Sequence, residues 1–280
     1  MLIPPLLSLG RFDKPIGITL LLFPCWWGVV LESGLAFDIK FLLLFAVGAV
    51  VMRAAGCIVN DIFDRKVDAQ VARTKDRPLA CNEISLRAAL FFLIGLLFCG
   101  FLVLIQLPPR CWILALIAAC LATLYPLAKR VTPFPQLVLG ITFNFGVLIG
   151  AAAVTPNWLQ GTTIMVYGAG ILWTLAYDTI YALQDIDDDR QLGIGSTAIL
   201  FGSHVRGVVG WCYALMHLLL LTVIFLSASP FSYIAYGFLL LSITFILYKL
   251  YNLDLQNPNQ CREFFISNQW VGMFVFLSLL

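Results

Sequence analysis

The chain has 280 residues, of which 61% are hydrophobic and 11% are charged, and its mean hydropathy is +0.95. This composition excludes a soluble globular domain, because such domains carry about 25% charged residues. We therefore expect one integral-membrane domain over residues 1–280, built only of α-helices. The eight cysteines and two histidines show no metal-ligand spacing, and nothing in the sequence indicates a protein or nucleic-acid partner.

Hydropathy predicts nine membrane helices, because each apolar run approaches the roughly 20 residues that cross the hydrocarbon layer. The predicted spans are residues 15–32, 39–59, 86–106, 111–128, 135–154, 162–182, 206–227, 231–250 and 264–280. With the N-terminus in the cytoplasm, only Lys40 and Arg110 of the 17 basic residues fall on the far side, as the positive-inside rule requires. Gly146 and Gly150 have the spacing of a helix-packing motif.

Three aspartates follow the second predicted span. On a helix, Asp61, Asp64 and Asp68 lie at i, i+3 and i+7 and so share one face. Like charges at this spacing cost roughly a few tenths of a kcal/mol in water, and more near lipid, unless a cation lies between them. Carboxylate oxygens suit Mg2+, which binds through few carboxylates together with the oxygens of a substrate phosphate. The alternative reading is a solvated acidic helix end.

A second acidic segment follows the sixth predicted span. Asp185 and Asp189 repeat the spacing of Asp64 and Asp68, and Asp178 lies near the same face as Asp185 if the helix continues that far. Both pairs lie on the same side of the membrane, so they can face each other across one site. We expect them to supply ligands for Mg2+ ions that hold a diphosphate, while basic residues of the loops neutralise the outer phosphate oxygens.

Arg53 lies inside the second predicted span, at an apolar depth where an unpaired guanidinium is costly. It precedes Asn60 by two helical turns and so lies on roughly the same face. A negatively charged partner is required, and it is either a bound carboxylate or an acidic side chain of another helix.

These segments together resemble the UbiA superfamily of intramembrane aromatic prenyltransferases. The resemblance is carried by three runs of residues, Asn60 to Asp68, Tyr177 to Asp189 and Gly193 to Ala198. Similarity to its 4-hydroxybenzoate polyprenyltransferase branch is carried by Asp13 to Gly17, Arg73 to Leu79, Tyr125 to Arg130 and Pro135 to Gly140.

The resemblance implies a nine-helix membrane bundle that transfers a polyprenyl group from polyprenyl diphosphate to the ring of 4-hydroxybenzoate. The reaction would take place ortho to the hydroxyl group, as a step of ubiquinone synthesis, and would require Mg2+. The enzyme would lie in a bacterial inner membrane with its site on the cytoplasmic side, or in the mitochondrial inner membrane.

The resemblance also implies roles for individual residues. The metal ligands would be Asp64, Asp68, Asp185 and Asp189, with Asp187 and Asp188 leaving the set in the second segment open, and Asp178 would take the ring proton or support a ligand. The residues implied to bind the two substrates are Arg53, Asn60, Arg65, Arg73, Arg77, Tyr125, Lys129 and Arg130. Of these, Arg53 would bind the carboxylate of the aromatic acid, Asn60 would orient that acid or a metal ligand, and the basic loop residues would bind the diphosphate.

Two other functions are compatible with parts of the pattern. A relative with the same chemistry could prenylate another acceptor, such as a precursor of menaquinone, haem, chlorophyll or a glycerol-ether lipid. A transporter could also place carboxylates near a membrane pathway, but it would carry them near the bilayer midplane. Here two thirds of the 15 acidic residues lie in two segments at one membrane face, beside cations, which favours the enzyme.

Overall fold

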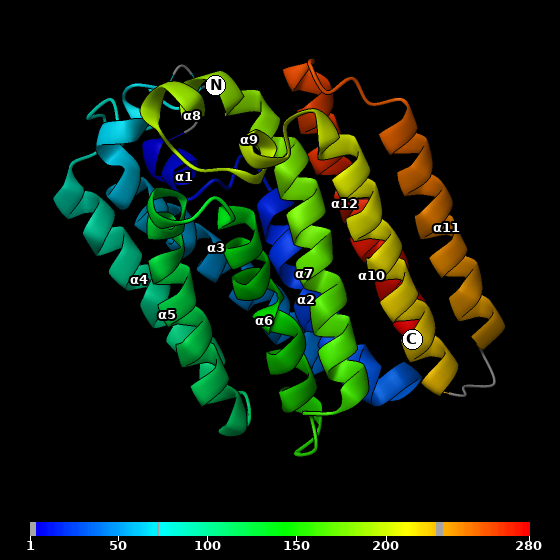
Figure 1. The fold of residues 1–280 in the computed structure, drawn as a ribbon. Coiled ribbons are helices and arrows are strands. Elements are labelled where there is room, and N and C mark those ends of the chain that lie inside the picture. The colour runs from blue at the N-terminus through cyan, green and yellow to red at the C-terminus, as the bar shows by residue number, and fades with distance from the viewer. Residues whose placement is uncertain (1–3, 72, 228–231) are drawn as a thin grey trace.

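The regular structure of the protein is entirely helical over the residues that the computed structural model describes (Figure 1). These are residues 4–71, 73–227 and 232–280, apart from the side chains of Lys129, Arg130 and Leu192. Within them, nine helices have 18 residues or more: α2 (Ile16–Ser33), α3 (Ile39–Asp68), α4 (Leu86–Leu104), α5 (Arg110–Val131), α6 (Pro135–Val154), α7 (Gly161–Ala182), α10 (Val205–Ser227), α11 (Ser232–Tyr251) and α12 (Pro258–Leu279). Each overlaps one predicted span, although α3 ends at Asp68 instead of residue 59 and α12 begins at Pro258 instead of residue 264.

Short helical elements lie before, between and after the long helices. The first, α1 (Pro5–Leu9), precedes α2. The others follow α7 and comprise the 3-10 turn η2 (Leu183–Asp185), α8 (Ile186–Leu192), α9 (Thr197–Phe201) and the 3-10 turn η3 (Gly202–His204). A further 3-10 turn, η1 (Gly34–Ala36), joins α2 to α3.

The protein is a multi-pass membrane protein, since seven stretches of the described chain are long and apolar enough to cross a bilayer. They contain α2, α3, α4, α5, α6, α10 and α11. The long helices α7 and α12 fall outside this set because they carry polar side chains such as Thr174, Asp178 and Asn268. Their crossing of the membrane, and hence the total of nine spans, stays a prediction.

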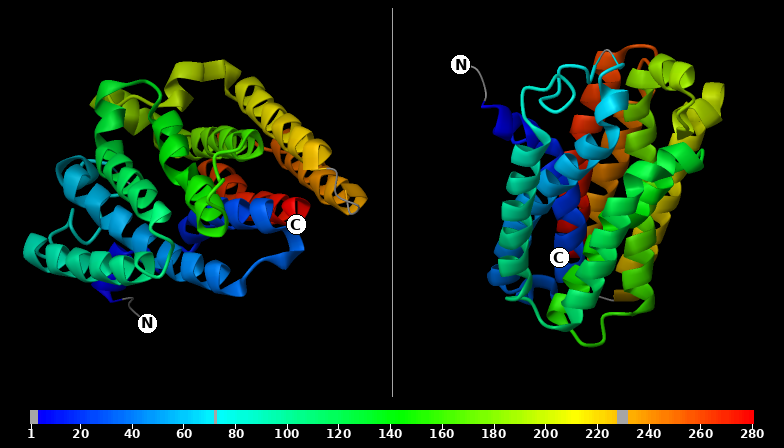
Figure 2. Two further views of the ribbon diagram at one scale, coloured as in Figure 1. Left: turned by 90° about the horizontal axis from the view of Figure 1, so that it is seen from below. Right: turned by 90° about the vertical axis from the view of Figure 1, so that its left-hand side faces the viewer.

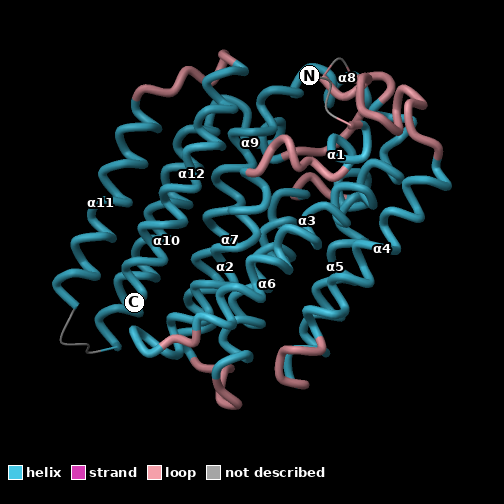
Figure 3. The backbone as a smooth tube through the Cα atoms, turned by 180° about the vertical axis from the view of Figure 1, so that it is seen from behind, coloured by secondary structure: helices cyan, strands magenta, loops and turns pink. Residues whose placement is uncertain are grey.

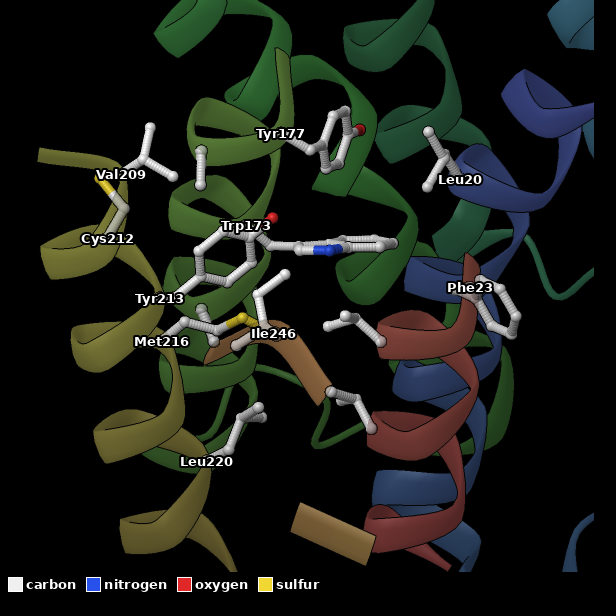
Figure 4. Packing of buried hydrophobic residues seen from close by; sticks show 14 of the residues in the cluster. Leu20, Phe23, Trp173, Tyr177, Val209, Cys212, Tyr213, Met216, Leu220 and Ile246 are labelled. Atoms are coloured by element: carbon white, nitrogen blue, oxygen red, sulfur yellow. The ribbon is translucent and has the colours of Figure 1, made fainter. Parts of the chain in front are cut away.

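Polar groups of α7 and α12 are partnered inside the bundle. Trp173 on α7 and Tyr213 on α10 both donate hydrogen bonds to Asn268 Oδ1 on α12, at 2.9 and 2.7 Å. The Trp173 ring lies tilted against Trp27, with ring centroids 5.0 Å apart. It meets Tyr177 edge to face, with centroids 5.1 Å apart (Figure 4). A buried amide is tolerated only when such partners satisfy it, so this network fixes how α7, α10 and α12 pack.

Glycines allow α2 and α6 to pack unusually closely near the middle of the bundle (Figure 2). A Cβ added to Gly28 would lie 2.1 Å from the carbonyl oxygen of Val147, and one added to Gly150 would lie 2.2 Å from the carbonyl oxygen of Cys25. The predicted packing role of Gly146 and Gly150 is thus confirmed, since Gly146 also faces α2 at Cys25.

Helix α3 is longer than its predicted span, which was expected to end at residue 59. Its 30 residues measure about 45 Å along the axis, whereas the hydrocarbon layer is about 30 Å thick. The last turns of α3, from Asn60 to Asp68, therefore reach the boundary of the membrane. At the same end of the bundle lie α1, the loop between α3 and α4, and α8 (Figure 3).

Substitution of Gly28 by alanine tests the close packing of α2 and α6. Because the obstructing atom belongs to the backbone of α6, the helices must separate, and we expect Gly28→Ala to destabilise the fold by about 1–3 kcal/mol. Thermal unfolding of the purified protein in detergent measures the loss. The matched control is Gly95→Ala, where the added methyl group meets no atom within 4 Å; equal melting temperatures for both variants would contradict this packing.

Candidate active site

The three aspartates at the end of α3 face the protein interior. Asp61, Asp64 and Asp68 retain only 2%, 1% and 5% of their exposed area, whereas Phe63 and Lys66 on the opposite face are exposed. The common face predicted from their spacing is confirmed. A solvated acidic helix end is excluded, because the three carboxylates are buried. They require compensating positive charge, since burying a carboxylate without it would cost several kcal/mol per charge.

Two arginines from different segments neutralise the first of these aspartates. Arg11, in the segment between α1 and α2, donates two hydrogen bonds to Asp61, at 2.8 and 2.7 Å. Arg77, in the loop between α3 and α4, contacts Asp61 at 3.1 Å and Asp68 at 2.7 Å. The Asp61 carboxylate therefore holds two segments, distant in sequence, against the end of α3.

Arg11 was not among the residues predicted for the site. Its backbone is in the left-handed region with φ of 57°, which a residue with a side chain adopts only when its surroundings enforce it. The guanidinium also bonds the carbonyl of Ser8 at 2.8 Å. The one sequence signal was a basic residue just before the Asp13 to Gly17 run, and nothing in it specified Asp61 as the partner.

Arg73 connects the two acidic segments. Its guanidinium donates to both oxygens of Asp185, with Nε to Oδ1 at 2.7 Å and Nη2 to Oδ2 at 2.5 Å, and lies 5.5 Å from the centre of the Tyr181 ring. Although partial burial alone would lower the pKa of Arg73, the hydrogen bonds that it donates to Asp185 raise it above its ordinary value, so the guanidinium stays charged. Thr74, the next residue, bonds the carbonyl of Asp68 at 3.0 Å, which brings the loop onto the first acidic segment as well.

The second acidic segment differs from its predicted geometry. Helix α7 ends at Ala182, and the backbone of Asp185, with φ of −114° and ψ of 12°, interrupts the helix before α8 begins. Asp178 and Asp185 therefore do not lie on one continuous helical face. The side chain of Asp187 is 85% exposed and lies 3.7 Å from Arg190, so it points away from the site.

Arg53 has no acidic side chain bound to it among the described residues. Its Nε atom is buried without a hydrogen-bond partner, and its guanidinium lies 5.7 Å from the centre of the Phe143 ring. Arg53 lies close enough to Asp178, Tyr125 and Tyr177 to interact with them electrostatically. Of the two predicted partners, an acidic side chain of another helix is thus not found in the described part of the chain.

The remaining predicted residues fall into three groups. Asn60 is half-buried on α3 and its amide makes no hydrogen bond to another described residue. Arg65 bonds the carbonyl of Leu79 at 3.1 Å and also Asn82, so it holds the loop between α3 and α4 and not the aspartate cluster. The predicted roles of Lys129 and Arg130 lie outside the described side chains.

Positive charge gathers beside the carboxylates at this end of the bundle. Lys14 is exposed just before α2. Partial desolvation, with repulsion from Arg11, Arg73 and Arg262, lowers its pKa below the ordinary value against the opposing effect of Asp13. Within the described residues no three acidic, cysteine or histidine side chains converge on a single point. The site instead consists of carboxylates and guanidinium groups in alternation, which suits a ligand that contains both cations and phosphate oxygens.

Comparison with known proteins gives concordant matches over nearly the whole chain. The profile of the UbiA prenyltransferase family matches residues 21–280. The mitochondrial 4-hydroxybenzoate polyprenyltransferase of Aedes aegypti is 40% identical over 98% of this chain, which spans 62% of that protein's length. The 4-hydroxybenzoate octaprenyltransferase of Shewanella loihica is also 40% identical, over 98% of this chain and 94% of its own.

A solved structure shows the same fold. It is that of a UbiA homologue from Archaeoglobus fulgidus, which was determined with DMAPP and Mg2+ bound. The TM-score is 0.71 at 17% identity, with 99% of this chain and 100% of the other covered.

Asp61→Asn tests whether that carboxylate holds the surrounding segments. The change leaves Arg11 and Arg77 without their shared partner, and we expect a loss of roughly 3 kcal/mol of stability, at the low end for buried pairs because these arginines keep 14% and 21% of their exposed area. Thermal unfolding in detergent measures it. Asp76→Asn, an exposed position in the same loop, is the control and is expected to melt with the parent protein; a parent-like melting curve for Asp61→Asn would contradict the assignment.

Proposed function

Because the chain belongs to the UbiA prenyltransferase family, we propose that it transfers a polyprenyl group from polyprenyl diphosphate to 4-hydroxybenzoate. The group joins the ring carbon ortho to the hydroxyl, as a step of ubiquinone synthesis. The observation that supports this most directly is the Arg73–Asp185 pair, which joins the two acidic segments. The same site holds Arg53, whose Nε is buried without a hydrogen-bond partner. The Aedes and Shewanella relatives are named as enzymes that transfer a polyprenyl or octaprenyl group to 4-hydroxybenzoate.

The donor side of the site consists of the two acidic segments and the basic loop. Asp64, Asp68, Asp185 and Asp189 would hold Mg2+, because their hard carboxylate oxygens suit that ion. Asp64 and Asp68 are buried, whereas Asp185 and Asp189 are half-buried. The bound metal would act as a Lewis acid on the diphosphate oxygens and so favour its departure. Arg73 and Arg77 already lie against these carboxylates, where the same guanidinium groups can contact a diphosphate held there.

The acceptor side lies one level deeper, around Arg53. Its unpartnered Nε is suited to the carboxylate of 4-hydroxybenzoate, since a charge-assisted hydrogen bond would satisfy a buried donor that is otherwise costly. This favours an acceptor that carries a carboxylate. Asn60, on the same face of α3 and with no hydrogen bond to another described residue, would orient the ring.

The reaction breaks the allylic C–O bond of the donor, and the electron pair leaves with the diphosphate. The ring carbon of the acceptor forms the new C–C bond and then loses its proton, which we assign to the carboxylate of Asp178. That residue lies within the electrostatic influence of both Arg53 and Arg73. The surrounding aromatic rings, including Tyr177 and Phe143, keep water from the reacting carbon.

The site faces the side of the membrane on which the N-terminal segment and the basic loops lie. We propose that this is the cytoplasmic side of a bacterial inner membrane, or the matrix side if the protein is mitochondrial, because positively charged loops stay on that side. The donor and the product are lipid-soluble and stay within the bilayer, while 4-hydroxybenzoate enters from water.

Asparagine substitutions test the metal-binding assignment. Asp64→Asn and Asp185→Asn each remove a negative charge from the donor side, and we expect prenyl transfer to 4-hydroxybenzoate to fall at least about 100-fold, because metal-assisted charge stabilisation contributes several kcal/mol. Chelation of divalent cations should abolish the product in the parent protein and magnesium should restore it. The assay is extraction of lipid-soluble prenylated acid from membranes.

Asp187→Asn provides the matched control in the same acidic segment. Its side chain is 85% exposed and points to solvent, so we expect activity within about twofold of the parent protein. Equal losses for Asp187→Asn and Asp185→Asn would contradict the assignment of the ligands. Consumption of diphosphate without prenylation of this acid would contradict the acceptor alone.

A further inference from the structure

The side chain of Arg53 lies across the first turn of α2 at a position where the chain has a glycine. Gly17 is buried, and a Cβ added to it would lie 2.3 Å from Arg53 Nε and 2.8 Å from Cζ and Nη2. Since such contacts are far shorter than two non-bonded atoms permit, no side chain at position 17 is compatible with the present place of the guanidinium. The absence of a side chain at residue 17 thus creates the space that Arg53 fills.

The opposite side of the guanidinium is also limited. The Phe143 ring, on α6, lies 5.7 Å from Arg53 Cζ, so the group is held between α2 and α6. An aromatic face attracts a guanidinium but offers no acceptor oxygen, and Nε remains buried without a partner. Gly17 and Phe143 thus fix the position of the Arg53 guanidinium from two sides. Its Nε stays available to form a hydrogen bond to a ligand.

We propose that Gly17 is a positioning residue for acceptor recognition, which keeps the Arg53 guanidinium where it can bind the carboxylate of an aromatic acid. This rests on the proposed function, in which Arg53 binds the acid. A methyl group at residue 17 displaces the end of a flexible side chain, so the helices need not separate. That distinguishes this position from Gly28, where the obstructing atom belongs to the backbone.

The position of the Arg53 guanidinium should determine how strongly the protein prefers an acid to the corresponding amide. A displaced guanidinium loses its aligned hydrogen bonds to a carboxylate but loses little toward a neutral group of the same shape, because only the charged group depends strongly on alignment. Gly17→Ala should therefore reduce the preference for 4-hydroxybenzoate over 4-hydroxybenzamide. The donor diphosphate binds elsewhere, so its KM should not change.

The experiment compares the parent protein with Gly17→Ala in two ways. Binding of 4-hydroxybenzoate and 4-hydroxybenzamide to the purified protein is measured by calorimetry, and prenyl transfer to each is measured in membranes. We expect Gly17→Ala to weaken binding of the acid and raise its KM by about 10- to 100-fold, with changes within about twofold for the amide and for the KM of the diphosphate. Gly56→Ala, three residues beyond Arg53 and with no atom within 4 Å of the added methyl group, is the control and should match the parent.

A second variant separates positioning from a general structural effect. In an Arg53→Ala background, Gly17→Ala should leave the ratio of acid to amide binding unchanged, because the group that it displaces is gone. Three results would each overturn the inference. Gly17→Ala could weaken binding of the acid and of the amide equally, it could lower the ratio of acid to amide binding further in the Arg53→Ala background, or the parent protein could bind the amide as tightly as the acid. If the parent binds the acid selectively but transfers no prenyl group to it, the proposed function fails and the binding ratios still decide the role of Gly17.

Discussion

The site depends on the burial of carboxylates that positive charge must compensate. Asp61, Asp64 and Asp68 are turned into the protein by the helical repeat of α3, and the interior cannot hold them without counter-charge. Arg11 and Arg77 supply part of that charge. Because these arginines come from the N-terminal segment and from the loop after α3, the requirement also determines how the chain is arranged outside the membrane. Electrostatic compensation thus organises the very segments that would bind a diphosphate.

Packing inside the membrane sets the position of the charged end. The close contact of α2 and α6 at Gly28 and Gly150, and the hydrogen bonds that Asn268 accepts, fix the helices on which the site is built. Two kinds of glycine serve different ends in the same helix. Gly28 allows one backbone to approach another, whereas Gly17 leaves space for the guanidinium of Arg53.

Much of this could be predicted from the sequence because it follows from periodicity. Hydropathy located each long helix, and the spacing of the aspartates on α3 gave their common face. Contacts between segments distant in sequence could not be predicted in that way. The pairing of Arg11 with Asp61 depends on a left-handed backbone, and the attachment of Arg65 to the loop depends on tertiary structure. The interruption of the helix at Asp185 is likewise a local conformation that no repeat announces.

The central claim is that both acidic segments bind one cluster of divalent cation and diphosphate. The most direct test is a titration of the purified protein with Mn2+, a spectroscopic substitute for Mg2+, followed by electron paramagnetic resonance with and without an allylic diphosphate. We predict that diphosphate tightens Mn2+ binding in the parent protein, and that neutralising Asp68 or Asp189 alone removes most of this effect. Retention of tight, diphosphate-dependent binding after the loss of either acid would contradict the claim that the two segments act together.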